Sequence, residues 1–158
     1  MFEFIEKLLN KKYTLSETVK VGQKEFYRIK AIKSFGNIAE GEYGGLVESE
    51  DNLSHDGNCW IYRGAMASDN SRVRDNAQLK DFSAISGNAL IEGKAIISGF
   101  SEVTQSAVIR DNSKVYDVSL ISGNSLICGS AIITGKTVIH NNCVSNNYVT
   151  NEMRLKHV

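Results

Sequence analysis

The segment from Gly57 to Glu152 repeats every six residues, and no other feature of the chain constrains its fold as strongly. One position of the repeat holds twelve consecutive Ala or Ser residues, from Ala65 to Ala131. The position two residues later is aliphatic from Ile61 to Ile139, and the position two residues earlier is Asp, Gly or Asn in nearly every repeat. The consensus, which runs over sixteen hexads, is (D/G)-(N/x)-(A/S)-x-(I/V)-x.

This pattern predicts a chain that coils around an aliphatic centre. Small, outward, aliphatic and outward positions alternate with period two, which indicates short β-strands. The chain has 13 Gly and no Pro, so Gly, Asn and Asp must make the tight turns. Gly and Asn tolerate positive φ, and each pair of Asp or Gly with the following Asn can therefore bend the chain at a corner.

The corner residues indicate three hexads per turn, because they change in blocks of three. Residues 18 apart would then stack, so that a polar corner alternates with Gly and like charges do not meet at the ~4.8 Å strand spacing. About five coils would form a prism roughly 25 Å long. The corner blocks are Asp69, Asp75 and Asp81, then Gly87, Gly93 and Gly99, then Gln105, Asp111 and Asp117, then Gly123, Gly129 and Gly135.

The repeat resembles the hexapeptide-repeat superfamily, whose members form left-handed, triangular, parallel β-helices. The resemblance, rather than the spacing, implies the left hand. The stretch from Gly41 to Tyr62, GEYGGLVESEDNLSHDGNCWIY, followed by G-N-A hexads, is similar to a group of bacterial and phage-borne hexapeptide-repeat proteins. Many members of that group carry an acyltransferase label that rests on the fold alone.

The sequence therefore predicts an all-β protein in three parts. Residues 1–56 form a capping segment, with an amphipathic helix over residues 2–11, a hairpin from Thr18 to Lys33 turning at Gly22-Gln23, and an irregular link. Residues 57–152 form the β-helix. The aliphatic position becomes Ser145 and then Asn151, which predicts the end of the core, and residues 153–158 form a tail.

Charge and cysteine content limit the environments and partners that the chain suits. The 18 basic and 18 acidic residues cancel, so bulk attraction to nucleic acid is not expected. No apolar run approaches the roughly 20 residues that span a bilayer, and the acids in MFEFIEKLLNKK make it a poor secretory signal. Three cysteines without a CxxC spacing favour unlinked thiols and a cytoplasmic location, in the host cell if a phage encodes the chain.

The sequence offers no catalytic constellation and no metal or cofactor site. A hexapeptide acyltransferase typically needs a histidine base and a loop that leaves the coil. The three histidines, His55, His140 and His157, lie in the cap, on a flat face and in the tail, and no hexad carries an insertion. Neither ligand spacing for a metal nor a Gly-rich phosphate loop is present.

Outward positions instead predict an apolar binding or oligomer face. Stacking at 18 residues aligns Leu90, Val108, Leu126 and Val144 on one face. Phe82, Phe100 and Val118 align at a corner. A soluble monomer rarely exposes such columns, so we expect a homodimer or homotrimer, or a foreign protein partner.

A second candidate site is an anion or nucleotide site. Trp60 and Tyr62 could stack on a base, while Arg72, Arg74 and Arg110 could bind phosphate. Solvated charges on a β surface are the simpler interpretation of these arginines.

Together these features favour a non-enzymatic binding protein of phage or mobile-element type. Flat β-helix faces would bind and inhibit a host factor, which would make the chain an anti-defence protein. One alternative is an acyltransferase that uses acetyl-CoA at a subunit interface, with His140 or His55 as the base. Another is a sponge that holds a small nucleotide signal between protomers.

Overall fold

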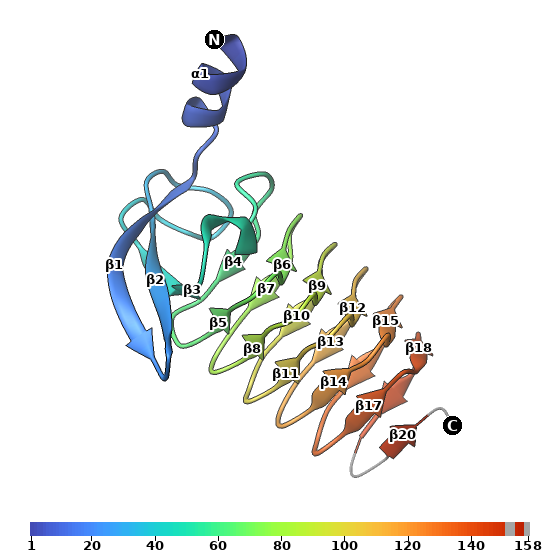
Figure 1. Ribbon diagram of the computed structural model, residues 1–158. Coiled ribbons are helices and arrows are strands. Elements are labelled where there is room, and N and C mark those ends of the chain that lie inside the picture. The colour runs from blue at the N-terminus through green and yellow to red at the C-terminus, as the bar shows by residue number, and fades with distance from the viewer. Residues whose placement is uncertain (151–153, 157–158) are drawn as a thin grey trace.

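The chain forms a parallel β-helix with a helix and a hairpin at its N-terminal end (Figure 1). The computed structural model describes residues 1–150 and the backbone of residues 154–156. Strands pair in parallel with strands 18 residues away, as Ile96 does with Lys114, which confirms three hexads per turn. The β-helix has about six turns rather than five, because strands from the cap and from the C-terminal end extend it. The left hand of the coil stays a prediction.

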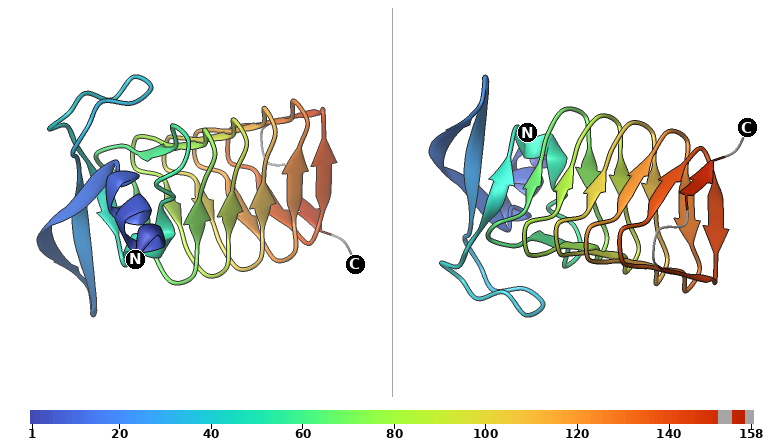
Figure 2. Two further views of the ribbon diagram at one scale, coloured as in Figure 1. Left: turned by 90° about the horizontal axis from the view of Figure 1, so that it is seen from above. Right: turned by 90° about the horizontal axis from the view of Figure 1, so that it is seen from below.

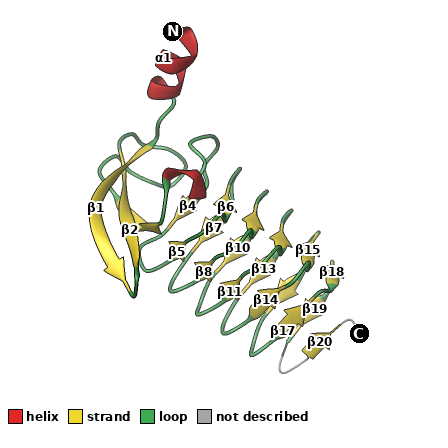
Figure 3. Cartoon of the chain, viewed as in Figure 1, coloured by secondary structure: helices red, strands yellow, loops and turns green. Residues whose placement is uncertain are grey.

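The strands form three sheets that run along the prism, as Figure 3 shows. The first sheet contains β1 (Tyr13–Val21), β2 (Lys24–Ala31), β3 (Tyr43–Val47), β5 (Met66–Ala67), β8 (Ala84–Ile85), β11 (Glu102–Val103), β14 (Leu120–Ser122), β17 (Val138–His140) and β20 (Arg154–Lys156). The second contains β4 (Trp60–Ile61), β7 (Gln78–Leu79), β10 (Ile96–Ile97), β13 (Lys114–Val115), β16 (Ile132–Ile133) and β19 (Tyr148–Val149). The third contains β6 (Arg72–Val73), β9 (Leu90–Ile91), β12 (Val108–Ile109), β15 (Leu126–Cys128) and β18 (Cys143–Ser145).

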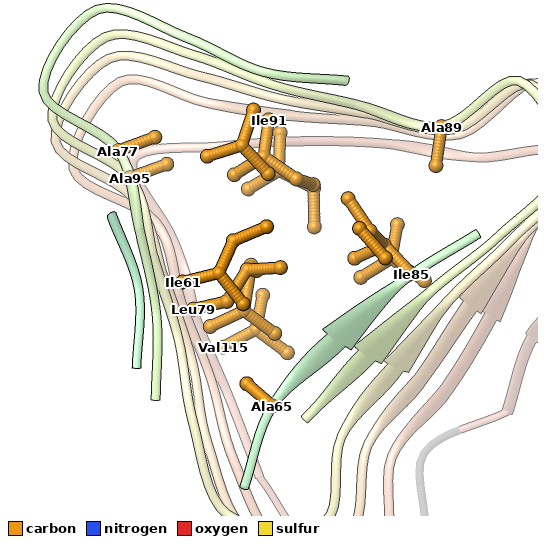
Figure 4. Close-up of a cluster of buried hydrophobic side chains, with 14 of the residues drawn as sticks. Ile61, Ala65, Ala77, Leu79, Ile85, Ala89, Ile91, Ala95 and Val115 are labelled. Carbon is orange, nitrogen blue, oxygen red and sulfur yellow. The ribbon is translucent and has the colours of Figure 1, made fainter. Parts of the chain in front are cut away.

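The aliphatic residues fill the centre of the prism (Figure 4). Ile91, Ile97 and Ile109 are completely buried, and the small residues lie beside the corners, where a larger side chain has no room. The buried serines among them are satisfied locally, because the hydroxyl of Ser83 donates to the carbonyl of Lys80 at 2.8 Å.

A repeated hydrogen bond explains why Asp and Gly alternate at the corners. The corner residues have positive φ, whether Gly or not; φ is 59° at Asp75 and 65° at Gly93. The Asp75 carboxylate accepts the N–H of Gly93, one coil further on, at 3.0 Å. A Cβ at Gly93 would lie 2.8 Å from the backbone nitrogen of Asp111, so Gly also provides space between two polar corners.

The last coil corrects the prediction that the core ends at Ser145. Leu126 pairs with Cys143, 17 residues away, instead of with Val144. The chain between Asn141 and β18 is one residue shorter than in the other hexads, and the next corner loses one more, since Ile132 pairs with Tyr148, 16 residues away. Val144 and Val149 therefore point inward and are 3% and 6% exposed. Asn151 lies outside the described residues.

The cap contains the predicted hairpin, β1–β2, which turns at Gly22 with φ of 62°. Strand β2 pairs with β3, and β3 pairs in parallel with β5, which links the cap to the coil. Gly44 and Gly45 lie in β3, within the part of the cap that the sequence predicts as an irregular link. They are needed for close approach, since a Cβ on Gly45 would lie 2.2 Å from the carbonyl oxygen of Ala65.

The helix α1 (Phe2–Leu9) stands apart from the rest of the cap. It has no buried residue, and it extends away from the hairpin, as Figure 1 shows. Figure 2 shows the helix and hairpin at one end of the stack of coils and the C-terminus at the other. The η1 turn (Glu50–Asn52) lies near its foot, where Lys11 pairs with Glu50 at 2.9 Å.

Candidate functional site

The third sheet carries most of the predicted apolar face. Leu90, Val108 and Leu126, here called the leucine ladder, lie in register on neighbouring strands and are half-buried. Val144 is not part of it, because the shortened corner turns this side chain into the core. The exposed thiol of Cys143 occupies the fourth position instead.

A more exposed apolar surface lies at the corner between the second and first sheets. Phe82, Phe100 and Val118, here called the phenylalanine ridge, are 64%, 65% and 54% exposed. The rings of Phe82 and Phe100 stack with centroids 5.2 Å apart and planes 15° apart. This stacking aligns the two rings along a convex edge of the prism.

The structure does not bring the residues of the predicted anion site together. The prediction that Trp60 lies on the outer surface is wrong. Trp60 is completely buried because residues of the cap cover its face of the coil. Phe35 meets it edge-on at 5.3 Å between ring centroids, and Tyr13 at 6.3 Å. The hexad pattern marks this position as outward but contains no signal for the cover. Trp60 cannot stack on a ligand from solution.

The other four residues of that prediction fall into separate places. Tyr62 is half-buried and lies under the ammonium group of Lys80, 5.1 Å from the ring centroid. Arg72 and Arg74 line an open groove of about 710 Å³ at the foot of α1. The Nε of Arg74 donates to Glu92 at 2.7 Å, and Arg110 lies two coils from Arg74. Acidic residues of the η1 region also line the groove, so its charge is mixed.

His55 is engaged in holding the cap together. The backbone N–H of Lys12 donates to its Nδ1 at 3.2 Å, so the proton lies on Nε2, which donates to Glu50 at 2.7 Å. Its ring stacks on Tyr13 with centroids 4.2 Å apart. Burial lowers the pKa of His55 despite the opposing charge of Glu50. Burial opposes ionisation of Glu50, but bonds from Lys11 and His55 outweigh it and lower its pKa.

His140 contacts the hydroxyl of Ser122 in a geometry that does not suit a general base. The Nδ1 of His140 lies 2.9 Å from Ser122 Oγ. The Asn141 amide oxygen accepts the N–H of Asn124, so the amide nitrogen faces His140 Nε2 at 3.1 Å and donates to it. The proton is therefore on Nδ1, and His140 donates to Ser122 rather than accepting its proton. His157 lies outside the described residues.

A buried lysine is the feature that sequence reasoning missed most completely. Lys12 is 1% exposed, and its ammonium group donates to the carbonyl of Cys59 at 2.8 Å and lies 3.3 Å from the Cys59 sulfur. Burial lowers the pKa of Lys12 and raises that of the Cys59 thiol. Lys12 is also 4.8 Å from the centroid of the Phe35 ring. These contacts join β1 to the first coil.

No family model matches the chain, and no curated protein matches it in sequence. Among the described residues, no helix is long and apolar enough to cross a membrane, and no group of three or more His, Cys, Asp or Glu side chains is arranged to hold a metal ion.

Proposed function

We propose that this chain is a binding protein whose β-helix presents the phenylalanine ridge to a partner protein. The observation that carries the proposal is the exposure of Phe82, Phe100 and Val118 in one column. Exposed apolar columns of this kind are typical of interaction sites. Aromatic side chains are also enriched among the residues that dominate binding energy.

The shape of the ridge indicates the shape of its partner. The ridge follows a convex corner, and its neighbours in sequence, Asp81, Gly99 and Asp117, form the corner itself. A convex apolar edge fits an apolar groove better than a flat surface. The coil also keeps the three side chains at the ~4.8 Å strand spacing, so little order is lost on binding.

The likeness of Gly41–Tyr62 to phage-borne proteins extends the proposal to the kind of partner. We infer a host protein in the bacterial cytoplasm, which the chain binds and inhibits as an anti-defence factor. The occupied ring nitrogens of His55 and His140 give the acyltransferase alternative no support. The dispersal of the predicted anion site likewise leaves the nucleotide sponge without a specific observation in its favour.

A pull-down from bacterial lysate tests the proposal. The double variant Phe82→Asp/Phe100→Asp should lose the captured protein, with binding of the purified partner weaker by about 100-fold. Tyr148→Asp is the matched control, since Tyr148 is also 65% exposed but lies on another part of the coil. Unchanged capture by the double variant, with an unchanged circular dichroism spectrum, would refute the ridge as the binding site.

A further inference from the structure

We propose that α1 of one copy of this chain docks on the leucine ladder of a second copy, and that two such reciprocal contacts hold a dimer together. The proposal concerns a different surface from the phenylalanine ridge and does not depend on the ridge's function.

The helix lacks the packing that a helix of its length needs. It has eight residues, no side-chain bond at its N-cap and no buried residue. Isolated helices shorter than about 12 residues are marginal in water, and most helical stability comes from an apolar side that packs. The apolar side of α1 is fully available: Phe2, Phe4, Ile5, Leu8 and Leu9 are 86%, 68%, 47%, 52% and 74% exposed.

The dimensions of α1 match those of the ladder. Ile5 and Leu8 lie at the middle of the apolar side and are about 4.5 Å apart along the helix axis at 1.5 Å per residue. Leu90, Val108 and Leu126 repeat at the strand spacing of ~4.8 Å. Neighbouring helix side chains can therefore enter successive gaps of the ladder, and the helix, about 12 Å long, covers its three members.

Charged residues beside the two apolar surfaces are complementary, because Glu92, which follows Leu90 in the column of Arg110, is already paired with Arg74. Glu6 borders the Phe2–Leu9 edge of the apolar side of α1. Arg110 follows Val108 by two residues and lies beside the ladder, just after the end of β12. Its Nε is 3.9 Å from the carboxylate of Asp111, the nearest acidic group. A helix on the ladder brings Glu6 toward Arg110, which selects one direction of the helix.

The chain holds α1 away from its own ladder. Asn10 donates to Asp56 at 2.7 Å, and Lys11 pairs with Glu50, so the end of α1 is attached to the cap. The groove lined by Lys7 and Arg72 separates the helix from β6, the first strand of the third sheet. A second copy can reach the ladder without breaking these contacts.

The area involved is close to that of a specific dimer. A buried aromatic side chain removes roughly 150–250 Å² from water. Phe2 and Phe4 flank Ile5 and Leu8 on opposite edges of the apolar side, so each is partly covered on the ladder. Two reciprocal contacts, with matching area on the ladders, therefore approach the lower end of the roughly 1,200–2,000 Å² of a standard interface.

The first experiment measures the mass of the full chain in solution by light scattering or sedimentation. The wild type should be a dimer. A helix variant, Ile5→Asp/Leu8→Asp, and a ladder variant, Leu90→Asp/Leu126→Asp, should each raise the dimer Kd by about 100-fold. Val21→Asp, in the hairpin at 40% exposure, should leave the dimer unchanged and is the matched control.

Mixing the two variants distinguishes this contact from its alternatives. A heterodimer retains one intact contact, between the helix of the ladder variant and the ladder of the helix variant. We expect heterodimers on mixing, although each variant alone is monomeric. If α1 paired with α1, or ladder with ladder, mixing the two variants would give no heterodimer. The absence of heterodimers would therefore overturn the proposal. A wild-type chain that stays monomeric when its concentration in the light-scattering measurement is raised 100-fold also overturns the proposal. A retained circular dichroism spectrum shows that each variant is folded.

Discussion

The cap and the coil of this protein are stabilised in different ways. In the coil, the same contacts recur: an aliphatic residue in the centre, a small residue beside the corner and a carboxylate on the N–H of the next coil. In the cap, each contact is unique, as with the Lys12 ammonium group on Cys59 and the His55 ring on Tyr13. Repetition distributes stability over many equivalent positions, whereas the cap depends on a few side chains.

This difference assigns separate tasks to the two regions. An open coil end has unpaired backbone groups, and the cap covers them through β3. The cap must therefore be specific, since it joins one particular end. The coil tolerates variation on its outer surface because its inner contacts do not depend on the outward residues, and this freedom allows an exposed phenylalanine ridge.

The largest effect should follow from removing the ring of the first coil on which the cap packs. Trp60→Ala deletes a completely buried ring that contacts Phe35 and Tyr13, and should lower the free energy of unfolding by about 3–5 kcal/mol. Ile109→Val in the middle of the coil should cost only about 0.5–1.5 kcal/mol. Urea unfolding followed by circular dichroism measures both. An equal cost for the two variants would remove the distinction between cap and coil.

Two glycines with similar φ separate backbone strain from crowding. Gly22 in the hairpin has φ of 62° and no atom within 4 Å of a Cβ, so Gly22→Ala should cost about 1–2 kcal/mol of strain. Gly93 has φ of 65°, but its Cβ would meet Asp111, and Gly93→Ala should cost about 2–4 kcal/mol. The same urea titration compares them. If the two costs were equal, close stacking of the corners would not be the reason for Gly.

The corner carboxylates should contribute small, equal amounts. Asp75→Ala and Asp111→Ala each remove an acceptor from a Gly N–H, at 3.0 and 2.8 Å, and each should cost about 0.5–1 kcal/mol. The two positions are two coils apart, so the costs should add in the double variant. A strongly unequal or non-additive result would contradict the equivalence of the coils.

Acid should loosen the cap before the coil. The folded pKa of His55 lies below the free value of 6.5, so its contribution to stability is complete above 6.5 and is lost as pH falls through the folded pKa. The pKa of Asp117 is lowered by bonds from Thr134 and Gly135, so its contribution is lost only below about 3.8. Hydrogen exchange at pH 7, 5 and 3.5 should show β1 opening first. His55→Gln should weaken the pH dependence of the cap.

Much of the coil could be predicted from the sequence, because each hexad repeats the same physical demand. The three-hexad turn, the inward aliphatic residues and the corner positions follow from period two and turn chemistry. The shortened last coil was missed, since Ser145 continues the count of six while Val144 takes the inward position. The cover over Trp60 and the burial of Lys12 were also missed, because single long-range contacts leave no periodic signal.

The two candidate surfaces also differ in how far the sequence predicts them. Phe82 and Phe100 could be identified from spacing alone, since they belong to the repeat. The exposure of α1 could not, because an amphipathic helix predicts that an apolar side packs but does not indicate on what.

Native mass spectrometry of the tagged protein, recovered gently from bacterial lysate, tests most directly whether the coil binds a partner while the cap helix assembles the chain. The wild type should carry two copies of the chain and an added protein mass. Phe82→Asp/Phe100→Asp should keep two copies and lose the added mass, and Ile5→Asp/Leu8→Asp should keep the added mass on a single copy. The account would be contradicted if Phe82→Asp/Phe100→Asp kept the partner's mass. It would also be contradicted if either variant lost both the partner and the second copy of the chain.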